Sequence, residues 1–187
     1  MVASPLTQMM GAPLCGGAAA ALVARTNRVR RDRRGEPVVR ILATEMVTES
    51  YDPAWIAVGP SVGPPEMTGA AARKAYESAG VGPKDLDLAL VHDSWVNEEL
   101  EYYEQLGLCR PGEAEMLADD GSTALGGRIP VNPDGGLVAR GHAIGASGLA
   151  QIHEVWLQLR GHAGKRQVEG ARTALATLVG GGSAATV

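Results

Sequence analysis

Over most of its length the sequence alternates between segments typical of helices and segments typical of buried strands, and this alternation constrains the fold most strongly. The stretch 67–79 is rich in Ala and charged residues and precedes Gly80, which predicts a helix that ends at a glycine. Residues 86–91 run apolar like a buried strand, and residues 98–106 predict a second helix. This succession is typical of an α/β protein, in which helices cover a sheet.

The C-terminal part continues the same alternation. Residues 109–127 are polar and predict a short helix between surface loops, and residues 137–140 resemble a short strand. A helix is predicted over 145–160, where apolar side chains recur at helical spacing and form one stripe. The stripe consists of Leu149, Ile152, Trp156 and Leu159. Residues 173–179 and 183–187 predict two final strands.

The N-terminal part is less regular. Residues 16–24 form a short apolar stretch that fits a buried strand and a short helix equally, because it shows no period. Six arginines between positions 25 and 34 predict a solvated helix or loop, with a phosphate-binding patch as the alternative. Residues 37–44 predict a strand rich in branched side chains, and the prolines and glycines of 53–65 predict a linker or a long loop.

Composition narrows the classes of function. The 187 residues carry 17 Lys and Arg and 21 Asp and Glu, a formal net charge of −4, which argues against a nucleic-acid or membrane-surface protein. Cys15 and Cys109 are too few for a disulfide scaffold and lack the spacing of a zinc site, so no metal is expected. The N-terminus shows no secretory signal pattern, and the apolar run 18–24 is too short to span a bilayer. We therefore expect a cytoplasmic protein.

Polar residues directly follow the predicted strand 86–91, where open α/β sheets place their reactive groups. His92 is suited to hydrogen-bond donation or proton transfer near neutral pH. Asp93 is predicted either to orient His92 or to cap the helix that follows. Ser94 and Trp95 complete this loop.

Two glycine-rich loops carry further candidate chemistry. Asn132 opens the first, which leads through several glycines to His142 just before the predicted helix 145–160. Backbone N–H groups and the helix dipole then converge near His142, which favours its neutral form and a role as a base. The second loop, 180–182, consists of three glycines, which fit an oxyanion hole and a simple bend between strands equally.

In their order and spacing these loops resemble the C-terminal domain of the thiolase superfamily, most closely its sterol-carrier-protein-x type of lipid-transfer-protein acyltransferases. The motifs are His-Asp-x-aromatic at 92–95, Asn-x-x-Gly-Gly at 132–136, Gly-His-x-x-Gly-Ala-Ser-Gly at 141–148 and Gly-Gly-Gly at 180–182. The resemblance implies an α/β, thiolase-like layered fold. It divides the chain into a remnant of the thiolase N-terminal domain (1–55), a linker (56–66) and a complete C-terminal domain (67–187), about half of a two-domain enzyme.

The resemblance also implies roles for individual residues. His142 would activate a cysteine nucleophile and help to hold the thioester oxygen, and His92 would help to form an oxyanion hole. The backbone of Gly180 and Gly181 would line the site. The supporting residues would be Asp93, Ser94 and Asn132. The substrate would be an acyl-CoA thioester of lipid or sterol metabolism, and no bound cofactor is expected.

The sequence departs from the family pattern where the family carries its cysteines. Neither Cys15 nor Cys109 lies in a nucleophile motif, and Ser94 and Leu178 stand where relatives hold an acid/base cysteine. Three hypotheses follow. The chain is a thiolase-like acyltransferase that is incomplete without an N-terminal half carrying the nucleophile, a thiolase-like retro-aldolase acting on β-hydroxyacyl-CoA, or a non-catalytic interaction module. Partner chains would be a thiolase half or an OB-fold protein, and a homodimer is a further expectation.

Overall fold

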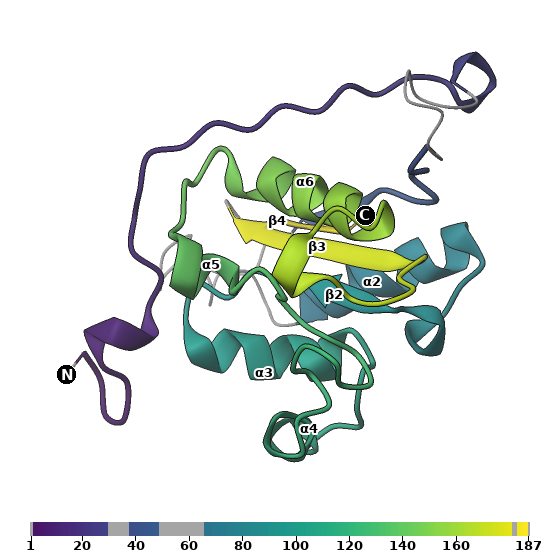
Figure 1. The fold of residues 1–187 in the computed structure, drawn as a ribbon. Helices are drawn as coiled ribbons and strands as arrows, with labels where there is room; N and C mark the ends of the chain where they lie inside the picture. Colours follow the sequence, from purple (N-terminus) through teal and green to yellow (C-terminus); the bar gives the residue numbers. More distant parts are fainter. Residues whose placement is uncertain (1, 30–37, 49–65, 181–182, 187) are drawn as a thin grey trace.

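A computed structural model describes residues 2–29, 38–48, 66–180 and 183–186 (Figure 1). One four-stranded sheet has the order β1-β4-β3-β2. Its strands are β1 Glu45–Thr48, β2 Leu88–Leu90, β3 Ala174–Gly180 and β4 Ser183–Thr186. β2 and β3 are parallel, whereas β4 is antiparallel to both of its neighbours. The carboxyl ends of β2 and β3 therefore lie at the same edge of the sheet.

Helices lie on both sides of this sheet. They are α2 Glu66–Ala79, α3 Val96–Gln105, α4 Ala114–Asp119, α5 Gly136–Arg140 and α6 Ser147–Leu159, with short 3-10 turns at Gln8–Met10, Thr26–Arg28, Pro83–Asp85 and Gly164–Arg166. Figure 1 shows α6 covering one face of the sheet and α2 and α3 on the opposite side. The α/β class predicted from the sequence is confirmed.

The hydrophobic core lies between the sheet and the helices α2 and α3. All three residues of β2 are fully buried. Ala71 and Ala72 of α2 belong to the same core cluster as Ala89 of β2, and their small side chains let α2 approach the sheet closely. Tyr102 and Leu106 close the core from the side of α3. The glycines that end α2 and α3, Gly80 and Gly107, have positive φ angles as expected of helix C-termini.

The helix α6 confirms the prediction over 145–160, but its polar side chains are the buried ones. Ser147, Gln151, Glu154 and Gln158 are each at most 4% exposed, whereas Leu149 and Trp156 are 42% and 38% exposed. Buried Glu154 accepts two hydrogen bonds from Arg166, at 2.9 and 2.8 Å, which satisfies its charge. The apolar stripe predicted from the sequence therefore lies on the outer side of the helix.

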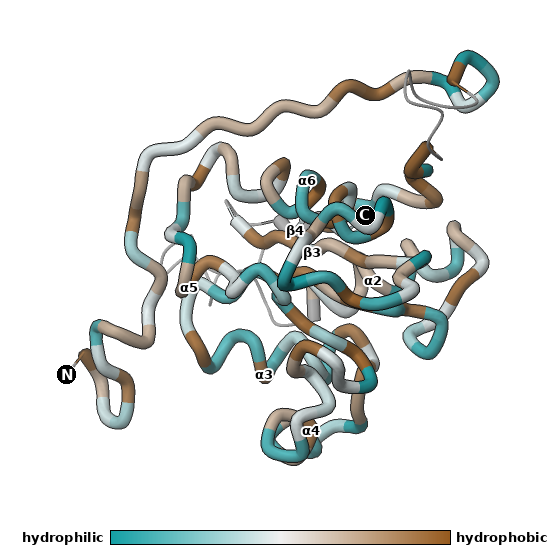
Figure 2. Tube along the Cα trace, in the orientation of Figure 1, coloured by the Kyte–Doolittle hydropathy of each residue, from teal (hydrophilic) through white to brown (hydrophobic). Residues whose placement is uncertain are grey.

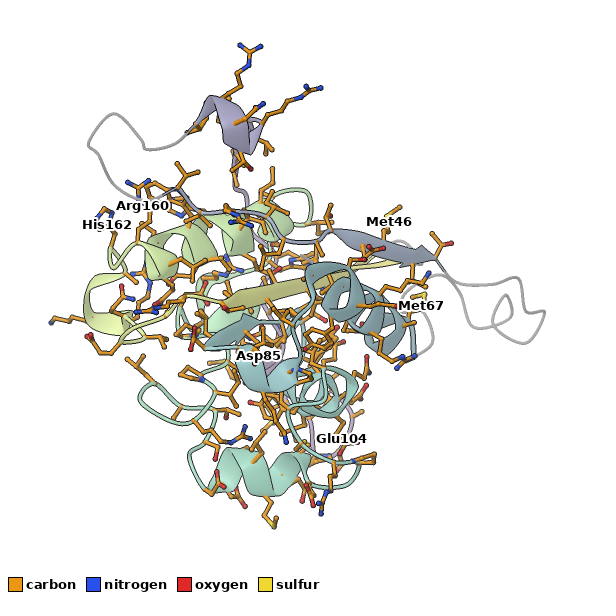
Figure 3. The ribbon with its side chains drawn as sticks, turned by 90° about the vertical axis from the view of Figure 1, so that its right-hand side faces the viewer. Met46, Met67, Asp85, Glu104, Arg160 and His162 are labelled. Atoms are coloured by element: carbon orange, nitrogen blue, oxygen red, sulfur yellow. The ribbon has the colours of Figure 1, made fainter. Side chains whose placement is uncertain are left out.

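The outer face of α6 borders a cavity of about 490 Å³. Ile152 and Trp156 line it from the helix, and Leu22 and Ile41 line it from the N-terminal segment. At the C-terminal end of α6, the guanidinium of Arg160 lies 4.5 Å from the centroid of the Trp156 ring, and the ring of His162 lies 6.2 Å away (Figure 3).

Three predictions of secondary structure are wrong. Residues 16–24 form neither a strand nor a helix, and they are mostly exposed. Figure 2 shows this segment running extended past α6. Residues 38–44 form no strand, because the pairing with β4 begins only at Glu45. Residues 137–140 form the helix α5 rather than a strand, since the first N–H groups of α5 bind a distant carboxylate, described below.

Some predictions fall outside the described residues. The linker or long loop predicted from the prolines and glycines of 53–65 is one of them. The others are the domain linker 56–66 implied by the family resemblance, of which only residue 66 is described, and the arginines from position 30 to position 34. Among the helices that the structure describes, none is long and apolar enough to cross a membrane.

Candidate active site

The site forms where β2 ends. Both main-chain polar groups of Val91, the residue directly after β2, are hydrogen-bonded to side chains. Its N–H donates to Asn132 Oδ1 at 2.9 Å, and its carbonyl accepts from Gln151 Nε2 at 3.0 Å. Asn132 has a positive φ of 46° and reaches the strand from the loop that precedes α5. These two buried amides fix the direction in which His92 leaves the sheet.

His92 and His142 meet although they lie 50 residues apart. Their Nε2 atoms are 3.5 Å apart, and the ring centroids are 5.0 Å apart with an interplanar angle of 72°. His142 comes from the loop between α5 and α6, directly after Gly141, whose φ of 88° favours glycine. The two histidines singled out in the sequence thus converge on one point.

Hydrogen bonds around His142 define its tautomer. Ser147 Oγ donates its hydrogen to the carbonyl of Ala143 at 3.0 Å, and it lies 2.9 Å from His142 Nδ1. Since the hydroxyl hydrogen is engaged, Ser147 accepts a hydrogen bond from Nδ1–H, which leaves the lone pair of a neutral ring on Nε2. Burial and the nearby charge of Arg140 lower the pKa of His142. His142 is therefore a neutral base at pH 7.

His92 is more deeply buried. Desolvation, with a smaller contribution from His142, lowers the pKa of His92 to about 4, so its ring is neutral at pH 7. The lone pair on His142 Nε2 faces His92 Nε2, which places the proton of His92 on that atom. The other ring nitrogen, Nδ1, lies 4.0 Å from the Glu98 carboxylate.

Asp93 neither orients His92 nor caps the helix that follows it, because its carboxylate is engaged elsewhere. Its two oxygens accept the N–H groups of Leu137 at 2.7 Å and Val138 at 3.3 Å, in the first turn of α5. Gly136 has a φ of 66°, and a Cβ atom there would overlap the carboxylate of Asp93. Desolvation raises the pKa of Asp93 to about 6, against the opposing effect of these hydrogen bonds. Asp93 therefore joins β2 to α5.

Ser94 begins α3 together with Glu98. Its N–H and O–H both donate to Glu98 Oε2, at 3.1 and 2.7 Å, so the carboxylate of Glu98 joins the first turn of the helix to the loop before it. The next residue, Glu99, accepts from Asn132 Nδ2 at 3.2 Å and from the Tyr103 hydroxyl at 2.5 Å. Asn132 thus connects the strand end to α3.

Gly180 is the last residue of β3 and lies at the same sheet edge as His92, because β2 and β3 are parallel. It is exposed and pairs with Ser183 of β4. Gly181 lies outside the described residues. The oxyanion role expected of these two glycines stays a prediction.

A segment of the N-terminal part, residues 11–17, crosses both histidine loops, and we call it the strap. Ala12 N–H donates to Ser94 O at 2.8 Å, and His142 N–H donates to Pro13 O at 2.8 Å. Cys15 N–H donates to His142 O at 3.2 Å, and the Cys15 sulfur packs against Gly141. The strap therefore forms one wall of the site through its main chain.

Three residues of the site were not singled out from the sequence. Ser147 and Gln151 lie one turn apart on α6 and face inward, toward His142 and Val91 respectively. Glu98 was part of a helix prediction only. Its spacing of four residues from Ser94 at a predicted helix start is the one sequence signal that could have pointed to it. Among the described residues, no group of three or more His, Cys, Asp or Glu side chains is arranged to hold a metal ion.

Comparison with protein families gives a match over residues 59–187 to the family described as "Thiolase C-terminal domain-like". "Sterol carrier protein 2" of Rattus norvegicus is 44% identical over 185 residues, which cover 97% of this chain and 33% of that protein. "Acetyl-CoA acetyltransferase" of Methanothermobacter thermautotrophicus is 39% identical over 185 residues, covering 97% of this chain and 46% of that protein. The chain thus spans a third to a half of these relatives.

Among solved structures, a chain of the "Ltp2-ChsH2(DUF35) aldolase" is similar to this one. The two superpose with a TM-score of 0.57 and are 32% identical in sequence. The match covers 66% of this chain and 32% of the aldolase chain. This likeness agrees with the thiolase-like layered fold that the motifs implied.

Proposed function

Because this chain belongs to the thiolase C-terminal domain-like family, we propose that its site takes part in acyl transfer on acyl-CoA thioesters of lipid or sterol metabolism. The observation that carries the proposal is the pair of Nε2 atoms of His92 and His142, 3.5 Å apart at the carboxyl edge of the sheet. One ring presents a lone pair and the other presents an N–H. A base and a hydrogen-bond donor at one point are what acyl transfer requires.

The proposed step begins at His142. Its Nε2 takes the proton of a cysteine thiol, and the thiolate attacks the thioester carbonyl. The carbonyl oxygen gains the negative charge and accepts a hydrogen bond from His92 Nε2–H. When the tetrahedral intermediate collapses, the C–S bond to coenzyme A breaks, and the departing thiolate takes the proton from His142. Coenzyme A thus enters as part of the thioester substrate and leaves as a product, and no resident cofactor is needed for this step.

The source of the thiol is a separate part of the proposal. Cys109 packs against the core after α3, where burial raises its pKa, and so it is unsuited to act as a nucleophile. Cys15 lies on the strap outside any nucleophile motif. We propose that the nucleophile comes from a thiolase half outside these 187 residues, on the same chain or on a partner. An OB-fold partner chain and a homodimer remain predictions, as does a cytoplasmic location.

The test is transfer of the acyl group of an acyl-CoA to labelled coenzyme A, followed by formation of labelled acyl-CoA. The chain is assayed alone and mixed with an N-terminal thiolase half that carries its cysteine. Turnover is expected in the mixture and is expected to fall at least about 100-fold in His142→Ala, because the base is lost. His153→Ala, an exposed histidine on α6 outside the site, serves as the control and should keep full activity. Equal turnover in His142→Ala and in the unmodified chain would refute the proposal.

A second candidate is retro-aldol cleavage of a β-hydroxyacyl-CoA, favoured by the likeness to the aldolase structure. Here His142 Nε2 takes the proton of the β-hydroxyl group, and the bond between the α- and β-carbons breaks. The electrons of that bond form an enolate, whose oxygen accepts the His92 hydrogen bond. The α-carbon of the enolate then takes up the proton that His142 removed from the hydroxyl group, which returns His142 to its neutral form. This reaction needs no thiol.

The two reactions separate in a chain without cysteines, Cys15→Ser with Cys109→Ser. Iodoacetamide should leave aldol cleavage by this variant unchanged, whereas it should abolish acyl transfer that depends on an added thiolase half. The double variant is needed because alkylation of Cys15 would place bulk against Gly141. Binding of acyl-CoA without any His142-dependent turnover would instead favour the non-catalytic interaction module.

A further inference from the structure

We propose that Glu98 is the positioning residue of His92, and that its carboxylate stabilises His92 in the doubly protonated form that donates a proton to the substrate. The inference rests on the proposed function and deepens it. It assigns a partner to His92 that no motif indicated, and it supplies an acid at a site where Ser94 and Leu178 stand in place of cysteines.

The geometry points to Glu98 through its fixed position. Its Oε2 atom lies 4.0 Å from His92 Nδ1, and the side chains of Glu98 and His92 are 17% and 11% exposed. The N–H and O–H of Ser94 hold the same oxygen. A carboxylate that its neighbours already hold in place loses little conformational entropy when it interacts with a charged ring. The electrostatic attraction between the two groups is therefore not cancelled by an entropy cost.

The neighbouring residue, Glu99, is also a carboxylate, but its oxygens are engaged away from His92. Both of its carboxylate oxygens accept hydrogen bonds, one from Asn132 and one from Tyr103, so Glu99 supports the scaffold. Glu98 is the carboxylate of α3 that lies beside His92. Glu101, on the same helix, is exposed.

Among the residues that the structure describes, few charged or titratable groups lie around His92. Glu98 approaches from α3, and His142 approaches from the loop before α6. Asp93 directs its oxygens to α5, and Arg140 lies beyond His142. The strap carries no charged side chain. Burial and His142 disfavour a second proton on His92. Glu98 is placed to oppose them through its charge, because its carboxylate lies 4.0 Å from His92 Nδ1.

The proposed step is balanced within the site. Doubly protonated His92 breaks its Nε2–H bond and an O–H bond forms on the substrate oxygen. The ring keeps its proton on Nδ1, which faces Glu98, and the positive charge disappears. Removal of the carboxylate makes the doubly protonated state less populated, and the rate of proton donation falls with that population.

The first measurement is an NMR titration of the histidine rings in the full chain without substrate, with His92 assigned from the missing signal in His92→Gln. In Glu98→Gln the pKa of His92 should fall by up to about one unit, because a charge 4.0 Å away in a partly screened site is removed. Burial also raises the pKa of Glu98, so the two groups take up protons in overlapping pH ranges and the observed fall becomes smaller as Glu98 is protonated. Ser94→Ala should lower the pKa of His92 by about half as much, because Glu98 then loses one of the two hydrogen bonds that fix its carboxylate beside the ring. Glu101→Gln is the matched control and should leave the titration unchanged.

The second measurement is the pH profile of turnover. In Glu98→Gln, kcat at pH 7 should fall about tenfold with KM within twofold, and the limb that descends with rising pH should move about one unit lower. A change in the His92 pKa below about 0.3 units, or an equal change in Glu101→Gln, would overturn the inference. The titration needs no turnover, so a coupled His92–Glu98 pair in a chain without acyl transfer would refute the proposed function alone.

Discussion

The N-terminal segment and the unit that begins at α2 are built in different ways. Among the described residues of 2–29 and 38–48, no side chain is buried. Within the described part of the chain, the buried apolar residues lie in 66–180, from Met67 to Val179. Yet the N-terminal segment reaches the two histidine loops and, through β1, the edge of the sheet.

This difference separates stability from the shape of the site. The unit from α2 onward is held by side-chain burial, the main source of folding free energy. The strap is held by main-chain hydrogen bonds to Ser94 and His142 and by contacts of its glycines. Substitutions in the first region should therefore change unfolding, whereas substitutions in the strap should change the wall of the site.

The largest effect on the free energy of unfolding is expected for Gly136→Ala. The new Cβ would overlap the Asp93 carboxylate, and the φ of 66° is strained for any residue but glycine. Clash and strain together should lower the free energy of unfolding by about 4 kcal/mol, measured by denaturant titration. Gly112→Ala is the matched control, since it shares a positive φ but has free space around it, and it should cost about 1 kcal/mol. Equal losses in both variants would show that Asp93 does not hold α5.

A pH effect of somewhat smaller size should come from Asp93 itself. Its pKa is about 6 in the folded chain, above the ordinary value of 3.8, so between these values the folded form binds more protons than the unfolded form. Asp93 should therefore contribute a fall of up to about 3 kcal/mol in the free energy of unfolding as the pH rises from 4 to 6.5. His92, whose pKa of about 4 lies below its ordinary value of 6.5, contributes a rise over the same range. Asp93→Asn removes only the contribution of Asp93, so the free energy of unfolding of the variant should rise with pH relative to that of the unmodified chain. Parallel pH profiles of the two chains would assign the dependence to other groups.

The same contrast explains what the sequence could predict. The ends of α2 and α3 follow from local signals, because Gly80 and Gly107 adopt the φ angles that only glycine favours. By contrast, α5 depends on Asp93, 44 residues earlier in the chain, and no local pattern carries that contact. Residues 16–24 are apolar but lie on the surface, since the sequence alone does not show which segments find a packing partner.

For the site, the motifs pointed to His92 and His142, and the structure brings both together. Glu98 was missed because its distance from His92 depends on how the first turn of α3 starts after Ser94. Gln151 was missed because α6 buries its polar side, the reverse of what the apolar stripe suggests. Polar residues that support a site from another element leave no periodic signal.

An intermediate effect on the free energy of unfolding is expected for Gln151→Leu. This substitution keeps the volume of the side chain but removes the amide that donates a hydrogen bond to Val91 O. A buried carbonyl without a partner should cost about 2 kcal/mol of unfolding free energy. The end of β2 should also shift, and turnover should fall with the position of His92. His153→Leu, an exposed change on the same helix, should alter neither quantity. A Gln151→Leu variant as stable as the unmodified chain would show that Val91 is held by Asn132 alone.

The smallest effect on stability, and the clearest division between the two regions, is expected for Gly17→Ala. The new Cβ would lie 2.9 Å from the Cβ of Ala143, next to His142, so the strap must move away. Because the strap buries no side chain, the free energy of unfolding should change by less than about 0.5 kcal/mol. The N–H of His142, which donates to Pro13, should nevertheless exchange with solvent at least about fivefold faster. Gly16→Ala meets no atom within 4 Å and should leave this exchange unchanged. If Gly17→Ala lowered stability as Gly136→Ala does, the strap would belong to the core after all, and the separation of stability from site shape would fail.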